Sequence, residues 1–267
     1  MSVSDRPDNG LAIRDLRVEF GGRVAVDGLG LVAPLGEITG LIGPNGAGKT
    51  STFNACSGLV KPARGSVHVL GHDVSARSSA QRAQLGLGRT FQRVELVNRA
   101  TVRRNVALGI EARIAGESWP KQIFSSARQR SQLATSTAEA MRRCGIEAIS
   151  ELRCTQLTTG QRRLVELARV IAGGYRLLLL DEPSSGLDER ETDRFGDLLQ
   201  DIVADGTVGV LLVEHDMRMV MTVCSYLYVL DFGRPIFDGT PAETRASDDV
   251  RAAYLGEALS VEYSGAA

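Results

Sequence analysis

The chain has 267 residues, a formal net charge of −1 and 43% hydrophobic residues. This length allows one large domain or two small ones, and the near-neutral charge argues against a nucleic-acid partner. The longest hydrophobic runs, 177–180 and 209–213, are far too short to cross a bilayer, and residues 1–10 lack the hydrophobic region of a signal peptide. We therefore expect a soluble, cytosolic chain that reaches a membrane only through a partner.

The first third of the chain predicts strands around a glycine-rich loop. Residues 1–10 are polar, and we expect a disordered tail there. Residues 11–33 alternate hydrophobic and polar side chains on either side of Gly21 and Gly22, which predicts two antiparallel strands joined by a tight turn. Residues 37–42 form a short hydrophobic run before the loop, and a helix is expected from Thr50. Residues 65–70 predict a further strand.

The middle of the chain has a different composition. Between about residues 99 and 151, glycine becomes rare, and Leu133, Thr137, Met141 and Cys144 recur at helical spacing. We expect a helical insert over residues 92–157. Its arginines are more typical of a solvated helix face than of an anion-binding site. The four cysteines show no metal-ligand spacing, so we expect reduced thiols in packing positions.

The last third predicts buried parallel strands. Residues 177–180, 208–213 and 227–230 are short hydrophobic runs between turn or helix segments. Thr240, Pro241 and Glu243 have the pattern of a capped helix start. The sequence thus predicts an α/β core with an antiparallel β-subdomain over 11–91 and 158–240, followed by a C-terminal helix and tail over 241–267.

The glycine-rich loop has the spacing of a phosphate-binding loop, G-x-x-x-x-G-K-[ST]. Glycines let the backbone curl around an anion, and the following helix adds its positive end. Lys49 is expected to reach the β- and γ-phosphates, the Thr50 hydroxyl to ligate Mg²⁺, and Ser51 to bond the α-phosphate. A chance lysine in a glycine-rich turn is the weaker interpretation. The residues expected to bind the nucleotide are Gly43, Pro44, Asn45, Gly46, Ala47, Gly48, Lys49, Thr50 and Ser51.

Two later segments carry side chains suited to phosphate hydrolysis. A run of four leucines ends in Asp181 and Glu182, where Asp181 is placed to hold Mg²⁺ and Glu182 to act as the general base. His215 follows the next hydrophobic run and can bond the γ-phosphate and orient the attacking water. Each would be a plain structural residue in isolation. The phosphate-binding loop earlier in the chain favours the catalytic interpretation.

Gln92 ends the strand-rich segment and begins the predicted insert. Its amide oxygen can ligate Mg²⁺ or the attacking water while the residue moves with the insert. A surface glutamine would be the preferred interpretation without the other motifs.

These motifs, in this order, resemble the ATPases of the ABC transporter family. The decisive segment is Leu157-Thr158-Thr159-Gly160-Gln161, which is similar to the family's L-S-G-G-Q signature, and residues 184–188 resemble the loop after the catalytic glutamate. Residues 86–92, 160–164 and 239–241 resemble the ATPase subunits of branched-chain amino acid importers, of the LivG type. The resemblance covers about residues 11–257.

The resemblance implies further roles. Phe20 occupies the family's position for an aromatic residue stacked on adenine, and Thr158, Gly160 and Gln161 would contact the ATP held by a second cassette. Thr159 replaces a glycine, and its β-branched side chain would strain a backbone of positive φ.

The partners implied by the resemblance are a second ATPase, identical or paralogous, then transmembrane permease subunits and, indirectly, a solute-binding protein, at the inner face of the plasma membrane. The predicted function is ATP hydrolysis, with ATP and Mg²⁺, that powers uptake of branched-chain amino acids or similar small polar solutes. Alternatives are an importer of urea or amides, a soluble ABC ATPase without a permease, and a nucleotide-binding module without hydrolysis. The nucleotide-binding module is disfavoured by Glu182 and His215, and the soluble ABC ATPase by the single cassette and the near-neutral charge.

Overall fold

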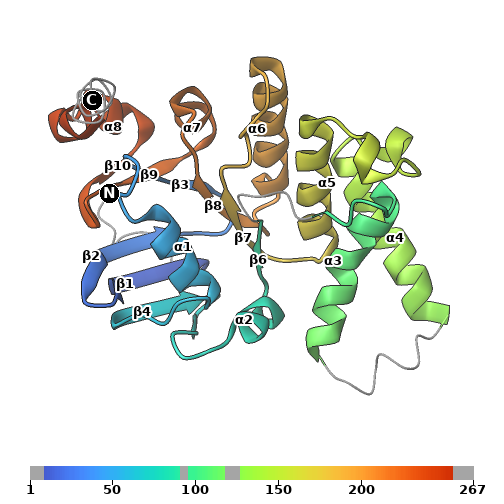
Figure 1. Ribbon diagram of the computed structural model, residues 1–267, viewed down its shortest axis with the longest axis horizontal. Coiled ribbons are helices and arrows are strands. Elements are labelled where there is room, and N and C mark those ends of the chain that lie inside the picture. Colours follow the sequence, from blue (N-terminus) through green and yellow to red (C-terminus); the bar gives the residue numbers. More distant parts are fainter. Residues whose placement is uncertain (1–8, 91–95, 118–126, 255–267) are drawn as a thin grey trace.

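The computed structural model describes residues 9–90, 96–117 and 127–254. Most of the expected N-terminal tail, Gln92 and the end of the predicted C-terminal segment lie outside these residues. Two β-sheets and the helices around them make up the described part of the chain (Figure 1).

The N-terminal half contributes a four-stranded antiparallel sheet with the strand order β2-β1-β4-β5. The predicted tight turn joins β1 to β2, with positive φ at both Gly21 and Gly22, as a two-residue hairpin with the right-handed twist requires. The predicted strand pair is therefore confirmed. The bounds are β1 (Leu11–Phe20), β2 (Arg23–Ala33), β4 (Arg64–Val69) and β5 (His72–Asp73).

The second sheet has six strands in the order β10-β9-β3-β8-β7-β6. Neighbouring strands from β9 to β6 run parallel, and β10 pairs antiparallel with β9. The predicted buried parallel strands are confirmed. The bounds are β3 (Ile38–Ile42), β6 (Leu87–Arg89), β7 (Leu177–Asp181), β8 (Gly209–Val213), β9 (Tyr226–Asp231) and β10 (Arg234–Gly239).

The parallel sheet is buried on both faces, which explains its uniformly hydrophobic strands. Along β7, Leu178 and Leu180 pack into a core shared with the helices on one face, while Leu177 and Leu179 pack into a core shared with the antiparallel sheet. Helix α1 (Lys49–Ser57) contributes Phe53 to the second core. Figure 1 shows α6 (Glu189–Val203) and α7 (Met217–Val223) on the opposite face of the parallel sheet from α1.

The helical segment between β6 and β7 packs around α5. Its described elements are α3 (Val102–Glu117), α4 (Ala127–Arg143), the short 3₁₀ turns Glu147–Ile149 and Cys154–Gln156, and α5 (Thr159–Ala172), whereas the short helix α2 (Ser79–Leu85) precedes β6. Both α3 and α4 contact α5, and α3 contacts α4. In Figure 1 these helices form a group beside the parallel sheet.

The C-terminal helix α8 (Pro241–Ala246) begins as predicted. The Thr240 side chain accepts from the Glu243 backbone N–H, and the Glu243 side chain accepts from the Thr240 N–H, with Pro241 in the first turn. Among the described residues, no helix is both long enough and hydrophobic enough to span a bilayer.

Gly109 lets α3 approach the backbone of α5. A Cβ at this position would overlap the carbonyl oxygen of Arg169. We predict that Gly109→Ala lowers the free energy of unfolding by about 1–3 kcal/mol, because two packed helices must separate. Urea denaturation measures the change.

Gly196→Ala is the matched control. Gly196 also lies inside a helix, α6, but a Cβ there would meet only the Val223 side chain, at 2.9 Å. Both changes share the gain in helix propensity, so equal denaturation midpoints for the two variants would contradict the packing argument.

Candidate functional site

The glycine-rich loop (residues 43–50) connects β3 to α1. Gly48 is the N-cap of α1 and has a left-handed φ of 103°. A Cβ at Gly48 would lie 2.6 Å from the Ala25 carbonyl oxygen, so a side chain is excluded on two grounds. The predicted helix start near Thr50 is confirmed, since α1 begins at Lys49.

Lys49 is buried within this loop. Its ammonium donates to the carbonyl oxygens of Gly43, at 2.6 Å, and Pro44, at 2.9 Å. The side chain is 6% exposed. The cation is therefore held inside the curl of the loop, next to the positive end of α1.

A pocket of about 710 Å³ opens beside the loop. It is lined by residues at the end of β1 and by residues that follow β3, β7 and β8. The residues predicted from the sequence that line it are Phe20, Asn45, Gly46, Ala47, Gly48, Lys49, Thr50, Ser51, Glu182 and His215. Arg23, Val24, Ala25 and Phe232 line it as well.

Glu182 and His215 form a hydrogen-bonded pair at this pocket. The His215 Nε2 lies 2.7 Å from Glu182 Oε1, although the two residues are 33 positions apart. Glu182 has a φ of +49°, a conformation that costs a non-glycine residue free energy and often marks a functional site. Its backbone N–H donates to the Val213 carbonyl at 2.8 Å, which fixes the loop after β7 against the end of β8.

Glu214 forms hydrogen bonds to the loop that follows β7 and to the loop that follows β8. The sequence motifs assigned it no role. One carboxylate oxygen accepts from the Ser184 N–H at 2.7 Å, and the other accepts from the His215 N–H at 3.0 Å. The residue is 3% exposed. Its position next to the predicted site residue His215 was the only signal in the sequence motifs that could have indicated a role. The hydrogen bond to the Ser184 N–H could be found only from the tertiary structure.

Asp181 ends β7 and is 3% exposed. Burial raises the pKa of its carboxyl group above the ordinary value, and the Arg89 guanidinium opposes that rise. Arg89 Nη2 lies 3.2 Å from Asp181 Oδ2. Arg89 is a second residue that sequence reasoning missed. Three residues were predicted to ligate Mg²⁺. Thr50 is the last residue of the glycine-rich loop, Asp181 is the last residue of β7, and Gln92 lies outside the described residues.

The signature residues lie apart from this pocket. Gly160 and Gln161 line a different pocket of about 200 Å³, against α6. Thr158 is the N-cap of α5: its hydroxyl accepts from the Gln161 N–H at 3.2 Å, and the Gln161 side chain accepts from the Thr158 N–H at 3.0 Å. The two side chains thus already cap their own helix.

The strain expected at Thr159 does not occur. Thr159 is the first residue of α5, and it is absent from the non-glycine residues of positive φ in the described chain, which are Asp15, Leu70, Glu182 and Phe232. A helical position accepts a β-branched residue at a small cost in propensity. The replacement of glycine is therefore compatible with the backbone here.

Comparison with known proteins agrees with this arrangement. The family model described as ABC transporter matches residues 26–185. The chain belongs to the ABC transporter family. It is an ATP-binding cassette, and so an ATPase of the class that couples hydrolysis to transport.

Three relatives illustrate the similarity of this cassette to others. LivG, a high-affinity branched-chain amino acid transport ATP-binding protein, is 34% identical in Salmonella typhimurium and 35% identical in Escherichia coli, over 93% of this chain and 98% of each relative. LptB, a lipopolysaccharide export system ATP-binding protein of Haemophilus influenzae, is 33% identical over 92% of this chain and 97% of its own length.

The fold also matches solved structures. An ATP-binding cassette of an ABC transporter in its ADP conformation superposes with a TM-score of 0.81 and 24% identity, over 92% of this chain and 98% of that one. A dimeric cassette with ADP and phosphate bound has a TM-score of 0.73 and 21% identity, over 86% of this chain and 98% of that one. The predicted α/β fold of the ABC type is confirmed.

Phe232 is an unpredicted aromatic side chain at the nucleotide pocket of the cassette. It is 90% exposed and lies in the turn between β9 and β10, with a φ of +43°. The neighbouring Gly233 N–H donates to the Ala47 carbonyl at 3.1 Å, and the Gly233 carbonyl accepts from the Asp27 N–H at 2.8 Å. These bonds hold the turn against the glycine-rich loop.

The cassette's pocket fits a nucleoside triphosphate. Gly46 faces open space, since a Cβ there would meet no atom within 4 Å, and the Lys49 ammonium lies on the inner side of the same loop. No group of three or more acidic, histidine or cysteine residues that could hold a metal occurs within the described ranges.

Lys49→Ala should raise the dissociation constant for ATP. Hydrogen bonds to charged groups contribute about 1.5–3 kcal/mol, which corresponds to roughly a 10- to 100-fold loss. Equilibrium binding of a fluorescent ATP analogue measures it. Lys61→Ala is the control, because Lys61 is exposed and is not among the residues that line the pocket. An equal affinity for both variants would exclude Lys49 from the phosphate site.

Proposed function

We propose that this cassette binds ATP and Mg²⁺ in the 710 Å³ pocket and hydrolyses the γ-phosphate to drive solute uptake through a partner permease. The observation that carries the proposal is the Glu182–His215 pair, which lies beside Lys49 at the carboxyl ends of neighbouring strands. A nucleotide-binding module without hydrolysis would have no need of a strained carboxylate there.

The residues of the proposed site divide into groups for the phosphates, the general base and the metal. Asp181, at the end of β7, is not among the residues that line the pocket, and Gln92 lies outside the described residues. The loop backbone and Lys49 hold the β- and γ-phosphates, Ser51 bonds the α-phosphate, and Phe20, which is 48% exposed, offers its ring to adenine. Thr50, Asp181 and Gln92 are the proposed Mg²⁺ ligands, directly or through water. Bound Mg²⁺ neutralises charge on the phosphates.

Glu182 is the proposed general base. Its Oε1 is held by His215 Nε2 at 2.7 Å, so that the imidazole fixes the orientation of the carboxylate that takes a proton from water. His215, which is exposed over nearly half of its side chain, also reaches the pocket where the γ-phosphate would lie. Glu214 keeps both loops in place from beneath.

A second cassette would complete the site. Thr158, Gly160 and Gln161 stand at the N-terminus of α5 and do not line the nucleotide pocket of their own chain. A helix N-terminus favours an anion, so this end would cap the γ-phosphate held by a partner cassette. The partner is a second copy or a paralogous ATPase. A dimeric relative of the same fold supports this assembly.

The transported solute is proposed from the relatives. LivG of Salmonella typhimurium and Escherichia coli and BraF of Pseudomonas aeruginosa are branched-chain amino acid transport proteins, 33–35% identical over 93% of this chain. We infer the same cargo or a similar small polar solute, delivered by a solute-binding protein, with the cassette on the inner face of the membrane. LptB, at 33% identity, serves another cargo, so the cargo needs a direct test.

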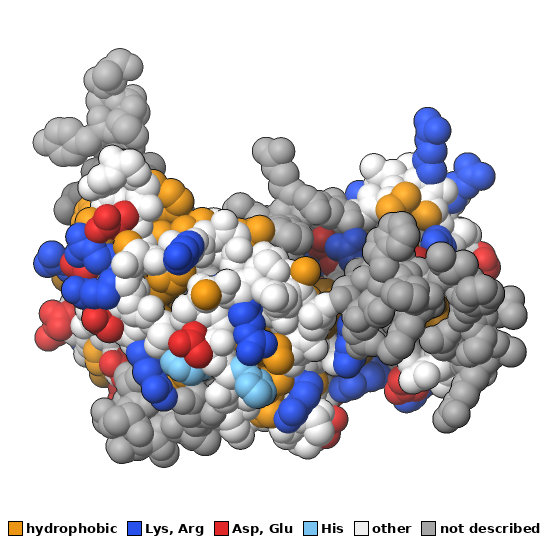
Figure 2. All heavy atoms as spheres, turned by 90° about the horizontal axis from the view of Figure 1, so that it is seen from below, with side chains coloured by type: hydrophobic (Ala, Val, Ile, Leu, Met, Phe, Trp, Pro, Cys, Tyr) orange, Lys and Arg blue, Asp and Glu red, His pale blue; other side chains and the backbone are white. Residues whose placement is uncertain are grey.

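A nucleic-acid partner is not supported. Lys and Arg number 31 against 32 Asp and Glu. On the face shown in Figure 2, basic, acidic and hydrophobic side chains are intermixed over the described residues. A nucleic-acid surface needs a basic patch or stripe.

Glu182→Gln should abolish most turnover and preserve ATP binding. Loss of a general base costs roughly 10²- to 10⁴-fold in rate. Phosphate release and analogue binding measure the two properties separately. Glu139→Gln is the control, since Glu139 is an exposed carboxylate of α4 that bonds Arg142. Turnover close to that of the control would remove Glu182 from this role.

The same Glu182→Gln variant tests the dimer. With ATP and Mg²⁺ it should form a stable dimer, by itself or with a paralogous ATPase, because hydrolysis no longer opens the site. Light scattering with and without ATP measures the mass. A monomer in every mixture would contradict the shared site.

The cargo is tested by co-purifying the cassette with candidate permease and solute-binding proteins. Leucine, isoleucine or valine should stimulate ATP hydrolysis of the reconstituted complex. Stimulation by urea or an amide alone would instead favour the alternative importer.

A further inference from the structure

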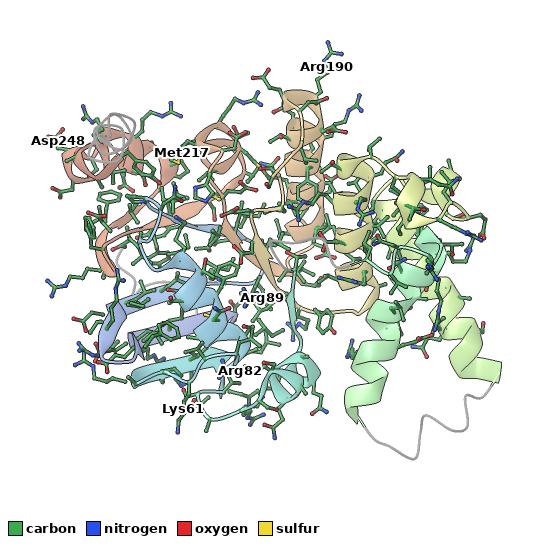
Figure 3. All side chains as sticks on the ribbon, viewed as in Figure 1. Lys61, Arg82, Arg89, Arg190, Met217 and Asp248 are labelled. Atoms are coloured by element: carbon green, nitrogen blue, oxygen red, sulfur yellow. The ribbon has the colours of Figure 1, made fainter. Side chains whose placement is uncertain are left out.

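Arg89 connects the metal-binding end of β7 to the helix that follows the glycine-rich loop. It is the last residue of β6, and its guanidinium Nη1 donates to Asn54 Oδ1 and Ser57 Oγ, each at 2.8 Å. Both acceptors belong to the last two turns of α1. In Figure 3 Arg89 is labelled near the centre of the molecule, where β6 passes α1.

The same guanidinium reaches Asp181. Nη2 donates to Asp181 Oδ2 at 3.2 Å, and the two side chains are only 10% and 4% exposed. The Phe53 ring, also from α1, lies with its centroid 5.7 Å from Arg89 Cζ, close enough for a cation–π contact. Arg89 is thus held by α1 through Nη1 and presents an Nη2 N–H to the Asp181 carboxylate.

Helix α1 supplies most of the contacts that the structure gives Arg89. Two hydrogen bonds and the Phe53 ring come from α1, and one hydrogen bond goes to Asp181, so α1 holds the guanidinium on two sides. A planar guanidinium offers its donors at fixed angles. Once Arg89 is fixed, it restricts the rotation of the Asp181 side chain.

We propose that Arg89 is a positioning residue for Mg²⁺, which holds Asp181 Oδ2 so that the carboxylate presents its other oxygen to the metal or to a water of the metal. The inference rests on the proposed function, in which Asp181 is a Mg²⁺ ligand. Because Arg89 is anchored on α1, the carboxylate is kept in register with Thr50, near the start of the same helix. Partners that orient a metal-binding carboxylate contribute to metal affinity without touching the metal.

The test measures binding of a non-hydrolysable ATP analogue across a series of Mg²⁺ concentrations and in EDTA. For Arg89→Met, the Mg²⁺ concentration at half-maximal enhancement of binding should rise roughly 10- to 100-fold, while affinity in EDTA stays at the wild-type value. Arg89→Lys keeps the charge but not the fork of donors, and it should show most of the same shift. Arg89→Lys also replaces Arg89→Met in the test if Arg89→Met does not fold.

Arg82→Met is the matched control. Arg82 is 1% exposed and donates to the Ala55 and Cys56 carbonyls, at 2.5 and 2.7 Å, at the same end of α1. Within the part of the chain that the structure describes, its hydrogen bonds go to backbone carbonyls and not to Asp181. This variant should lose stability on thermal unfolding and keep the wild-type Mg²⁺ dependence. An Mg²⁺ shift as large as that of Arg89→Met would reduce Arg89 to a structural role and overturn the inference.

A double-mutant cycle separates this inference from the function on which it rests. Asp181→Asn alone should shift the Mg²⁺ dependence, and Arg89→Met added to it should cause no further shift, because Arg89 acts through Asp181. An unchanged Mg²⁺ dependence in Asp181→Asn would remove the proposed metal role of Asp181 itself. A shift in Asp181→Asn with wild-type behaviour or tighter Mg²⁺ binding in Arg89→Met would overturn only the role of Arg89.

Discussion

The site depends on the parallel pairing of β3, β8 and β7. Parallel strands end at the same edge of a sheet, so the loops that follow them converge. Because β8 lies between β3 and β7, the glycine-rich loop, His215 and Glu182 follow three adjacent strands. Residues separated by more than 160 positions thereby line one pocket. The hydrophobic run of each strand stabilises the sheet that brings these residues together.

Burial on both faces makes that edge rigid. The alternating leucines of β7 are shared between two cores, one with the helices and one with α1 and the antiparallel sheet. A sheet that is packed on both faces can hold Glu182 at its positive φ, a conformation that an unsupported loop would not maintain. The buried Glu214 carboxylate accepts two hydrogen bonds from backbone N–H groups and fixes the loops that carry Glu182 and His215.

Helix α1 connects the glycine-rich loop to the end of β7. Its first turn carries Lys49 and Thr50, and its last turns hold Arg89, which reaches Asp181. A displacement of α1 would therefore move Lys49, Thr50 and the Asp181 carboxylate together. The signature helix α5 belongs to a separate surface, where α3 and α4 pack against it. Within the described residues, the pocket beside the glycine-rich loop and the N-terminus of α5 are therefore separate parts of the surface.

The sequence by itself determined the strands, the loop and most of the pocket. Periodicity of two, short hydrophobic runs and glycine spacing are local properties, and the motifs around Lys49, Glu182 and His215 are contiguous segments. Only the tertiary structure decided that Glu214, Arg89 and Phe232 belong with them, because each acts through a residue distant in the chain: Ser184, Asp181 and, through the adjacent Gly233, Ala47. It also decided the case of Thr159, since strain depends on the backbone φ, which the residue type alone does not determine.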